Sequence, residues 1–337
     1  MEFSEDASCT ITDRRSAVAL ARRGPYPHSN PRPQAPAAGA TMSQWIWING
    51  EIVPLSEARI GVEDRGFQFS DGVYEVIRLY HGRPFTLAPH LARLEQSCKG
   101  IQMALPLPQD AIKDAISKVV ERSGVKEGMV YLQITRGVAP RNHINPPKVS
   151  PVVLFYTRPL PAAPAPGAGE GVKLLTVQDE RWRRCWIKSI ALLANILAKN
   201  EAVDAGADEA VFVEDGVVSE CSASNLLAVI DGKVVTHPVG PKVLPGITRL
   251  VLTQLAKELG IDFIERPLRE DEARGADELF ITSTTRELNW VSHWDNQPVG
   301  GGRCGPVTRR LHEAYAQRVL RDIGAELKGT RRALAAV

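Results

Sequence analysis

WRRCWIKSIALLAN, residues 182–195, places a single lysine, Lys188, inside a run of tryptophan, isoleucine and leucine. An ammonium group among apolar side chains loses hydration, which lowers its pKa and makes a neutral, nucleophilic amine available. A lysine of this kind can form a Schiff base with an aldehyde. The alternative is that Lys188 extends its amine into water from the end of a strand or helix, which is the commoner case because buried lysines are rare.

Length and composition limit the class of protein. A chain of 337 residues predicts about two domains. The net charge of +2 gives no general attraction to nucleic acid or to an acidic membrane, so small molecules are the expected partners. The five cysteines are odd in number and none are spaced as C-x-x-C, which predicts neither disulfides nor a metal site and fits a cytoplasmic protein.

Changes in composition divide the chain into five parts. Residues 1–41 are rich in proline, alanine, arginine and serine, so we expect a disordered extension. Residues 42–158 mix strand and helix patterns and predict an N-terminal α/β domain. The proline- and alanine-rich segment 159–170 predicts an extended linker to a C-terminal domain at 171–325, with a tail at 326–337. The expected fold class is α+β.

Turn residues and apolar spacing locate the main elements. Asn-Gly at 49–50 predicts one tight hairpin, and Asp-Gly at 215–216 and 231–232 predicts two more, in an antiparallel meander. Residues 64–87 look β-rich, and a helix at 189–205 is expected to have Ser189 as its N-cap. The other expected helices are 90–101, 108–122, 248–259 and 307–320, and the other expected strands are 129–135, 152–157, 172–177 and 278–282.

Two segments of the second domain are expected to be helix starts that suit a phosphate. They are PGITR, residues 245–249, and STT, residues 283–285. Free backbone amides at a helix N-terminus, with hydroxyls beside them, attract an anion. Serine and threonine are also the commonest N-caps, which is the simpler explanation for either segment alone.

Three charged or titratable residues are further candidates. Glu220 ends a hairpin strand and could hold a proton on a pyridine nitrogen, or it is a solvated strand end. Arg141 and His143 lie in a loop after a strand, where arginine can bind a substrate carboxylate but is usually a surface residue. The arginines at 181, 183 and 184 interleave with tryptophan, and we expect local ion pairs there instead of a nucleic-acid surface.

Six motifs, in this order and at these separations, resemble the fold-type IV pyridoxal-phosphate aminotransferases and, among them, the D-amino-acid transaminases. The motifs are DRGFQFSDGVYEV (64–76), TRGVAPRNH (135–143), RWRRCWIKS (181–189), SECSASN (219–225), LPGITR (244–249) and ITSTT (281–285). The resemblance covers about residues 45–318. It implies a smaller N-terminal α/β sandwich domain and a larger C-terminal, mixed β-barrel-like domain with flanking helices.

The resemblance also implies a role for each matching residue. Lys188 is similar to the lysine that forms the internal aldimine and moves the substrate proton, and Glu220 to the partner of the pyridine nitrogen. The other implied cofactor-binding residues are Arg93, Leu244, Ile247, Thr248, Ser283 and Thr284. The implied substrate-binding residues are Tyr74, Arg141 and His143, the last two acting in the active site of the partner subunit of a homodimer.

The implied reaction is transamination between a D-amino acid such as D-alanine and a 2-oxo acid such as 2-oxoglutarate or pyruvate, with pyridoxal 5'-phosphate and no metal. The alternatives of the same fold are a branched-chain L-amino-acid transaminase, an amine transaminase and an aminodeoxychorismate lyase. A binding protein without turnover is disfavoured because Lys188 and Glu220 are both present. Relatives often have glycine and three serines after the glutamate, whereas this chain has Cys221, Ser222, Ala223 and Ser224, so one hydroxyl is expected to be missing.

Overall fold

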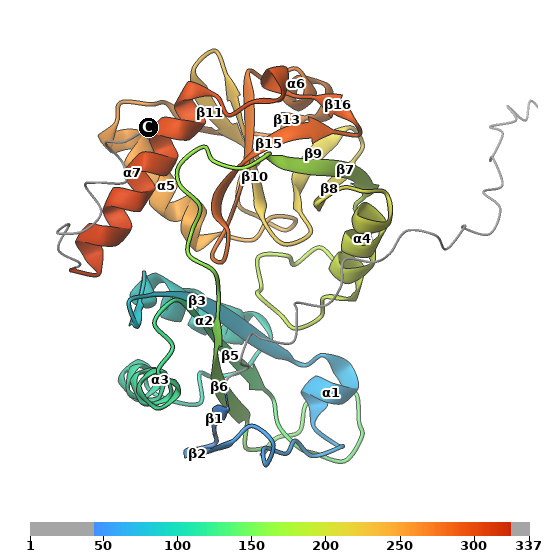
Figure 1. Cartoon of the computed structure of the whole chain (residues 1–337). Coiled ribbons are helices and arrows are strands. Elements are labelled where there is room, and N and C mark those ends of the chain that lie inside the picture. The colour runs from blue at the N-terminus through green and yellow to red at the C-terminus, as the bar shows by residue number, and fades with distance from the viewer. Residues whose placement is uncertain (1–43, 325–337) are drawn as a thin grey trace, which may run out of the picture. The chain divides into compact units, whose positions relative to one another are not determined.

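Two β-sheets organise the chain in the computed structural model, which describes residues 44–324. One has six strands in the order β2-β1-β6-β5-β3-β4 and uses residues 45–159. The other has ten strands from residues 172–298, in the order β12-β11-β10-β14-β15-β7-β8-β9-β13, with β16 paired to β15 (Figure 1). The predicted linker falls between the two sheets, and the extension predicted at 1–41 and the tail at 326–337 lie outside the described residues.

The six-stranded sheet begins with the predicted hairpin. Asn49 and Gly50 join its first two strands with φ angles of 49° and 106°, the positive values that an Asn-Gly turn supplies. The strands are β1 (Trp45–Ile48), β2 (Glu51–Pro54), β3 (Gly72–Tyr80), β4 (Arg83–Pro84), β5 (Gly128–Thr135) and β6 (Val152–Pro159). Helices α2 (Leu87–Gly100) and α3 (Gln109–Ser123) pack their apolar sides on this sheet, as their spacing predicts (Figure 1).

A short helix stands where the sequence looks β-rich. Helix α1 (Arg65–Phe69) follows Asp64, whose carboxylate accepts hydrogen bonds from the backbone N–H groups of Gly66 and Phe67 at 2.8 and 3.4 Å. It ends at Ser70 in the left-handed region, with φ 56°. The expectation of β structure is therefore wrong for the start of 64–87, because an N-capping aspartate stabilises the first helical turn.

The ten-stranded sheet contains both predicted Asp-Gly hairpins but not the predicted meander. Its strands are β7 (Val172–Gln178), β8 (Glu209–Glu214), β9 (Val217–Cys221), β10 (Asn225–Ile230), β11 (Lys233–Thr236), β12 (Phe263–Glu265), β13 (Leu268–Arg269), β14 (Glu278–Ser283), β15 (Glu287–Trp294) and β16 (Gln297–Pro298). Strands β14, β15 and β7 separate the two hairpins in the sheet. The meander is wrong because β14, β15 and β7 pair with strands far away in sequence. Strand β9 does not pair with β10, although only residues 222–224 lie between them.

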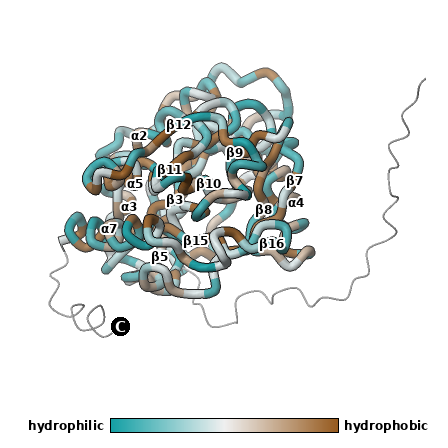
Figure 2. The backbone as a smooth tube through the Cα atoms, turned by 90° about the horizontal axis from the view of Figure 1, so that it is seen from above, coloured by the Kyte–Doolittle hydropathy of each residue, from teal (hydrophilic) through white to brown (hydrophobic). Residues whose placement is uncertain are grey.

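Helices flank the ten-stranded sheet. They are α4 (Leu193–Asp204), α5 (Ile247–Glu258), α6 (Glu270–Arg274), the 3₁₀ turn η1 (Gly300–Gly302) and α7 (Pro306–Asp322). Helices α5 and α7 pack together against β14. Leu311, Tyr315 and Val319 of α7 belong to this core, and Figure 2 shows α7 as a tube in which hydrophilic teal residues also occur. Tyr80 and Phe85, from the first half of the chain, join the same core cluster. The α+β fold class is confirmed.

No helix within residues 44–324 is both long enough and apolar enough to cross a bilayer.

Candidate active site

The backbone around Lys188 is held by elements of the six-stranded sheet. The Lys188 N–H donates to Ser97 Oγ on α2 at 3.1 Å, and its carbonyl accepts from the N–H of Tyr74 on β3 at 3.0 Å. Ser189 is buried and bridges Val73 of β3. Because this segment pairs with a strand, α4 begins only at Leu193, and the predicted helix start with Ser189 as its N-cap is wrong.

The side chain of Lys188 is half-buried beside an aromatic ring. Its Nζ donates to the Tyr74 hydroxyl at 3.3 Å and lies 4.3 Å from the centre of the ring. Tyr74 in turn stacks on Tyr131, with ring centres 5.8 Å apart. The lysine amine thus has a defined position and direction, which general acid–base chemistry requires.

Glu220 is a buried carboxylate with several donors. Its Oε1 accepts from Arg181 Nη1 at 2.6 Å, and its Oε2 accepts from Asn225 Nδ2 at 2.8 Å and from the Leu244 N–H at 3.0 Å. Burial raises the pKa of Glu220, and the guanidinium of Arg181 opposes that rise. Asn225 Nδ2 also donates to the Leu244 carbonyl, so the two groups that bind Glu220 Oε2 are hydrogen-bonded to each other. The alternative of a solvated strand end is therefore wrong.

A cavity of about 890 Å³ brings most of the predicted site residues together. Its volume is in the usual range for the binding site of a small ligand. Among its lining residues are Tyr74, Arg93, Lys188, Glu220, Leu244, Ile247, Thr248, Ser283 and Thr284.

The start of helix α5 opens onto this cavity. Gly246 is its N-cap residue and no side chain caps it, so the first N–H groups of α5 have no partner within the helix. Ser283 and Thr284 also line the cavity, but Ser283 ends β14 and Thr284 begins the turn that leads into β15. The prediction of a helix start at 283–285 is therefore wrong, because the chain reverses directly into a strand.

Comparisons with known proteins decide the family. The family model for class IV amino-transferases matches residues 72–294. The D-alanine aminotransferase of Bacillus licheniformis is 40% identical over 277 residues, which cover 82% of this chain and 98% of that protein. The chain belongs to the class IV aminotransferases.

Solved structures of the same fold are similar over more than nine-tenths of their length. The branched-chain amino acid aminotransferase of Escherichia coli superposes with a TM-score of 0.76 at 29% identity, covering 82% of this chain and 94% of that one. The T.th. branched-chain amino acid aminotransferase with pyridoxamine 5'-phosphate has a TM-score of 0.75 at 32% identity, covering 82% and 93%.

In this class IV aminotransferase Arg93 already has protein partners. Its Nε and Nη2 donate to the two carboxylate oxygens of Glu75 at 2.7 and 2.8 Å, and Nη1 donates to the Pro245 carbonyl at 2.8 Å. His90 Nδ1 lies 2.8 Å from the same carboxylate. The bond to Pro245 ties helix α2 to the residues that precede α5, where the guanidinium lines the cavity.

Arg141 and His143 are placed apart from the other predicted residues. Both are exposed, and neither lines the cavity. The Arg141 guanidinium lies 4.5 Å from the ring centre of Phe69, the His143 ring lies 5.5 Å from it, and Arg65 Nη1 donates to the Asn142 carbonyl at 2.5 Å. Helix α1 therefore holds this loop on the surface of the chain.

The ion pairs expected at residue 181 are confirmed, because Arg181 pairs with Asp179 and Glu220. No role was predicted from the sequence for Asn225, Ser224 or Thr282. Asn225 and Arg181 bind the Glu220 carboxylate, while Ser224 Oγ and Thr282 Oγ1 are buried without a hydrogen-bond partner and line the cavity. The available signal was polarity: Asn225 and Thr282 are polar residues in strands whose neighbours are apolar. Such residues are usually buried only when they have a partner.

Proposed function

We propose that this class IV aminotransferase transfers the amino group of a D-amino acid, of the D-alanine type, to a 2-oxo acid such as 2-oxoglutarate or pyruvate, with pyridoxal 5'-phosphate as its cofactor. The identity of 40% to a D-alanine aminotransferase, over 98% of that protein, supports the substrate class. The observation that carries the chemistry is that the amine of Lys188 and the buried carboxylate of Glu220 line one cavity.

The residues of the cavity fit pyridoxal 5'-phosphate. The uncapped start of α5, with Ile247 and Thr248, suits the phosphate, and Ser283, Thr284 and Arg93 line the same cavity. Buried hydroxyls without partners, those of Ser224 and Thr282, are costly unless a polar ligand meets them. A related solved structure contains pyridoxamine 5'-phosphate. When bound, the cofactor supplies an aldehyde for amino groups and a ring that withdraws electrons.

The protein's own groups then have separate tasks. With the cofactor bound, the Nζ atom of Lys188 would take the proton from the α-carbon of the amino acid, and its hydrogen bond to the Tyr74 hydroxyl at 3.3 Å orients it. The carboxylate of Glu220 holds a proton on the ring nitrogen, and the Leu244 N–H keeps that carboxylate in place at 3.0 Å. The position of the substrate carboxylate decides which hydrogen faces Lys188, and hence D or L.

Arg141 and His143 act, in this proposal, in the active site of the partner subunit of a homodimer. Both are exposed, and neither lines the cavity of its own chain. Three large apolar side chains of these segments are exposed: Ile144, next to His143, is 76% exposed, Phe67 on α1 is 79% exposed, and Val62, which precedes α1, is 78% exposed. Exposed apolar groups gathered in this way are typical of a contact surface.

We also infer a cytoplasmic location. The described cysteines, Cys98, Cys185, Cys221 and Cys304, are all free thiols. Unpaired cysteines are typical of a reducing compartment.

The test is a substrate comparison on purified protein reconstituted with pyridoxal 5'-phosphate. We expect pyruvate to form from D-alanine and 2-oxoglutarate, and L-alanine to be a much poorer donor. L-Leucine serves as the comparison donor, because the solved structures named above are branched-chain enzymes. Activity with L-leucine and none with D-alanine would contradict the proposed D-amino-acid substrate and favour a branched-chain L-amino-acid transaminase.

A further inference from the structure

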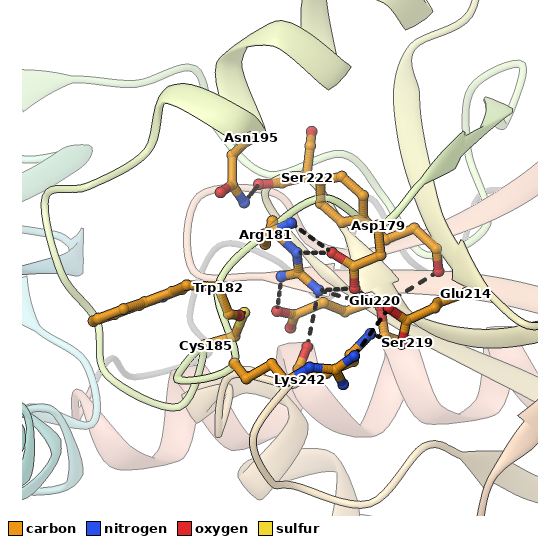
Figure 3. Close-up of polar contacts among 12 residues, drawn as sticks. Asp179, Arg181, Trp182, Cys185, Asn195, Glu214, Ser219, Glu220, Ser222 and Lys242 are labelled. Carbon is orange, nitrogen blue, oxygen red and sulfur yellow. Dashed lines mark hydrogen bonds and ion pairs between the residues drawn. The ribbon is translucent and has the colours of Figure 1, made fainter. Parts of the chain in front are cut away.

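Arg181 is the centre of a buried polar cluster behind Glu220. Its side chain is only 4% exposed, and all three guanidinium nitrogens donate hydrogen bonds (Figure 3). Nε and Nη2 bind the two carboxylate oxygens of Asp179, each at 3.0 Å, and Nη2 also donates to Ser219 Oγ at 3.1 Å and to the Lys242 carbonyl at 2.9 Å. Nη1 donates to Glu220 Oε1 at 2.6 Å. Arg181 therefore connects Ser219 and Glu220 of β9 to Asp179, which follows β7, and to Lys242 in the loop before α5.

The hydrogen bonds of Glu220 leave room for one more donor. A carboxylate offers about four acceptor positions. Arg181, Asn225 and the Leu244 N–H take three of them. Both Arg181 and Glu220 line the cavity, so a ligand there can reach the remaining position.

The charges of the cluster do not cancel. Asp179 and Glu220 carry two negative charges against the single positive charge of Arg181, which leaves one formal negative charge in a buried place. Lys242, whose carbonyl joins the cluster, has its own ion pair with Glu214. Buried unbalanced charge is costly, and a cation at the free acceptor of Glu220 would balance it.

We propose that Arg181 is a positioning residue that keeps Glu220 ionised and oriented, with its one free acceptor directed to the protonated ring nitrogen of the cofactor. The inference rests on the proposed function, because it concerns the same cofactor. Asp179 acts behind Arg181 by fixing the guanidinium from the opposite side. Without the arginine, two buried carboxylates would lie together unpaired, and one would take up a proton.

The test compares two cofactors on apo-protein. Pyridoxal 5'-phosphate has the ring nitrogen, and its 1-deaza analogue has carbon at that place. Each is titrated into wild type, Arg181→Met and the matched control Arg274→Met, with dissociation constants from absorbance. Arg274 is a suitable control because it binds Glu270 and Asp295 and lies over Trp294, but it does not line the cavity.

We expect wild type and Arg274→Met to bind pyridoxal 5'-phosphate more tightly than the analogue. In Arg181→Met the dissociation constant of pyridoxal 5'-phosphate should rise roughly tenfold or more, which corresponds to the loss of one charge-assisted hydrogen bond. The dissociation constant of the analogue should change little. Equal losses for both compounds, or no loss, would show a merely structural arginine and overturn the inference. Thermal unfolding of the apo-proteins gives the stability effect separately.

A second variant keeps the test decisive if Arg181→Met does not fold. Arg181→Lys retains the charge but not the fork that binds Asp179 and Glu220 together. We expect an intermediate preference, and a preference equal to wild type would contradict the inference. Wild type that binds neither compound would instead contradict the proposed function itself.

Discussion

The charged pair of Glu75 and Arg93 shows how single residues are tuned beside the cavity. Burial alone would raise the pKa of Glu75, but Arg93 and then His90 outweigh it and hold the pKa at about 2. Burial lowers the pKa of His90, against the attraction of Glu75. The guanidinium of Arg93 is thus fixed by a carboxylate that stays ionised at neutral pH, and it keeps its positive charge on the cavity wall.

At this scale we predict the effect of Glu75→Gln on stability. The variant leaves the Arg93 charge buried without its partner, which should lower the free energy of unfolding by about 3–5 kcal/mol at pH 7. Because the folded pKa lies below the usual value of 4.5, this stabilisation is complete above pH 4.5 and is lost as the pH falls toward 2. Urea unfolding of both proteins should show the difference shrinking over that range, while the exposed Glu121→Gln control differs little at any pH. A difference that stayed constant would contradict this account.

At the scale of elements, the loop before α5 is packed against Asn225 through a glycine. A Cβ at Gly246 would lie 2.0 Å from Asn225 Oδ1, whereas a Cβ at Gly240, in the same loop, would meet nothing within 4 Å. Gly246→Ala should therefore displace Asn225 from Glu220 and weaken binding of pyridoxal 5'-phosphate about tenfold, with a stability loss of about 1–3 kcal/mol. Gly240→Ala should bind as wild type does. Equal affinities of the two variants in a titration of apo-protein would refute the prediction.

The sequence predicted those elements whose signal is local. Asn49-Gly50 and the two Asp-Gly pairs specify their hairpins because the turn residues themselves adopt positive φ. The order of strands in the larger sheet could not be predicted, since β10 pairs with β14 across many intervening residues. For Arg181 the sequence predicted local ion pairs but not the partner Glu220, because only the folded chain brings that carboxylate, 39 residues away, beside it.

At the scale of the whole molecule, the proposed homodimer predicts that each active site uses Lys188 from one subunit and Arg141 from the other. Lys188→Ala and Arg141→Ala homodimers should both be nearly inactive toward D-alanine. A mixed dimer contains one complete site if Arg141 acts in the partner's cavity, so random re-association of equal amounts should restore about a quarter of wild-type activity. Mixing two Lys188→Ala preparations is the control. No recovery in verified mixed dimers would mean that the loop serves its own subunit.

The account as a whole depends on Lys188 being the lysine that binds the cofactor. The most direct measurement is reduction of the reconstituted protein with borohydride, followed by peptide mass spectrometry to locate the pyridoxyl phosphate label. We predict the label on Lys188, and none on Lys199, which lines the same cavity, or on Lys242, whose carbonyl accepts a hydrogen bond from Arg181. A label on Lys199 or Lys242, or protein that takes up no label, would contradict the claim that Lys188 binds the cofactor.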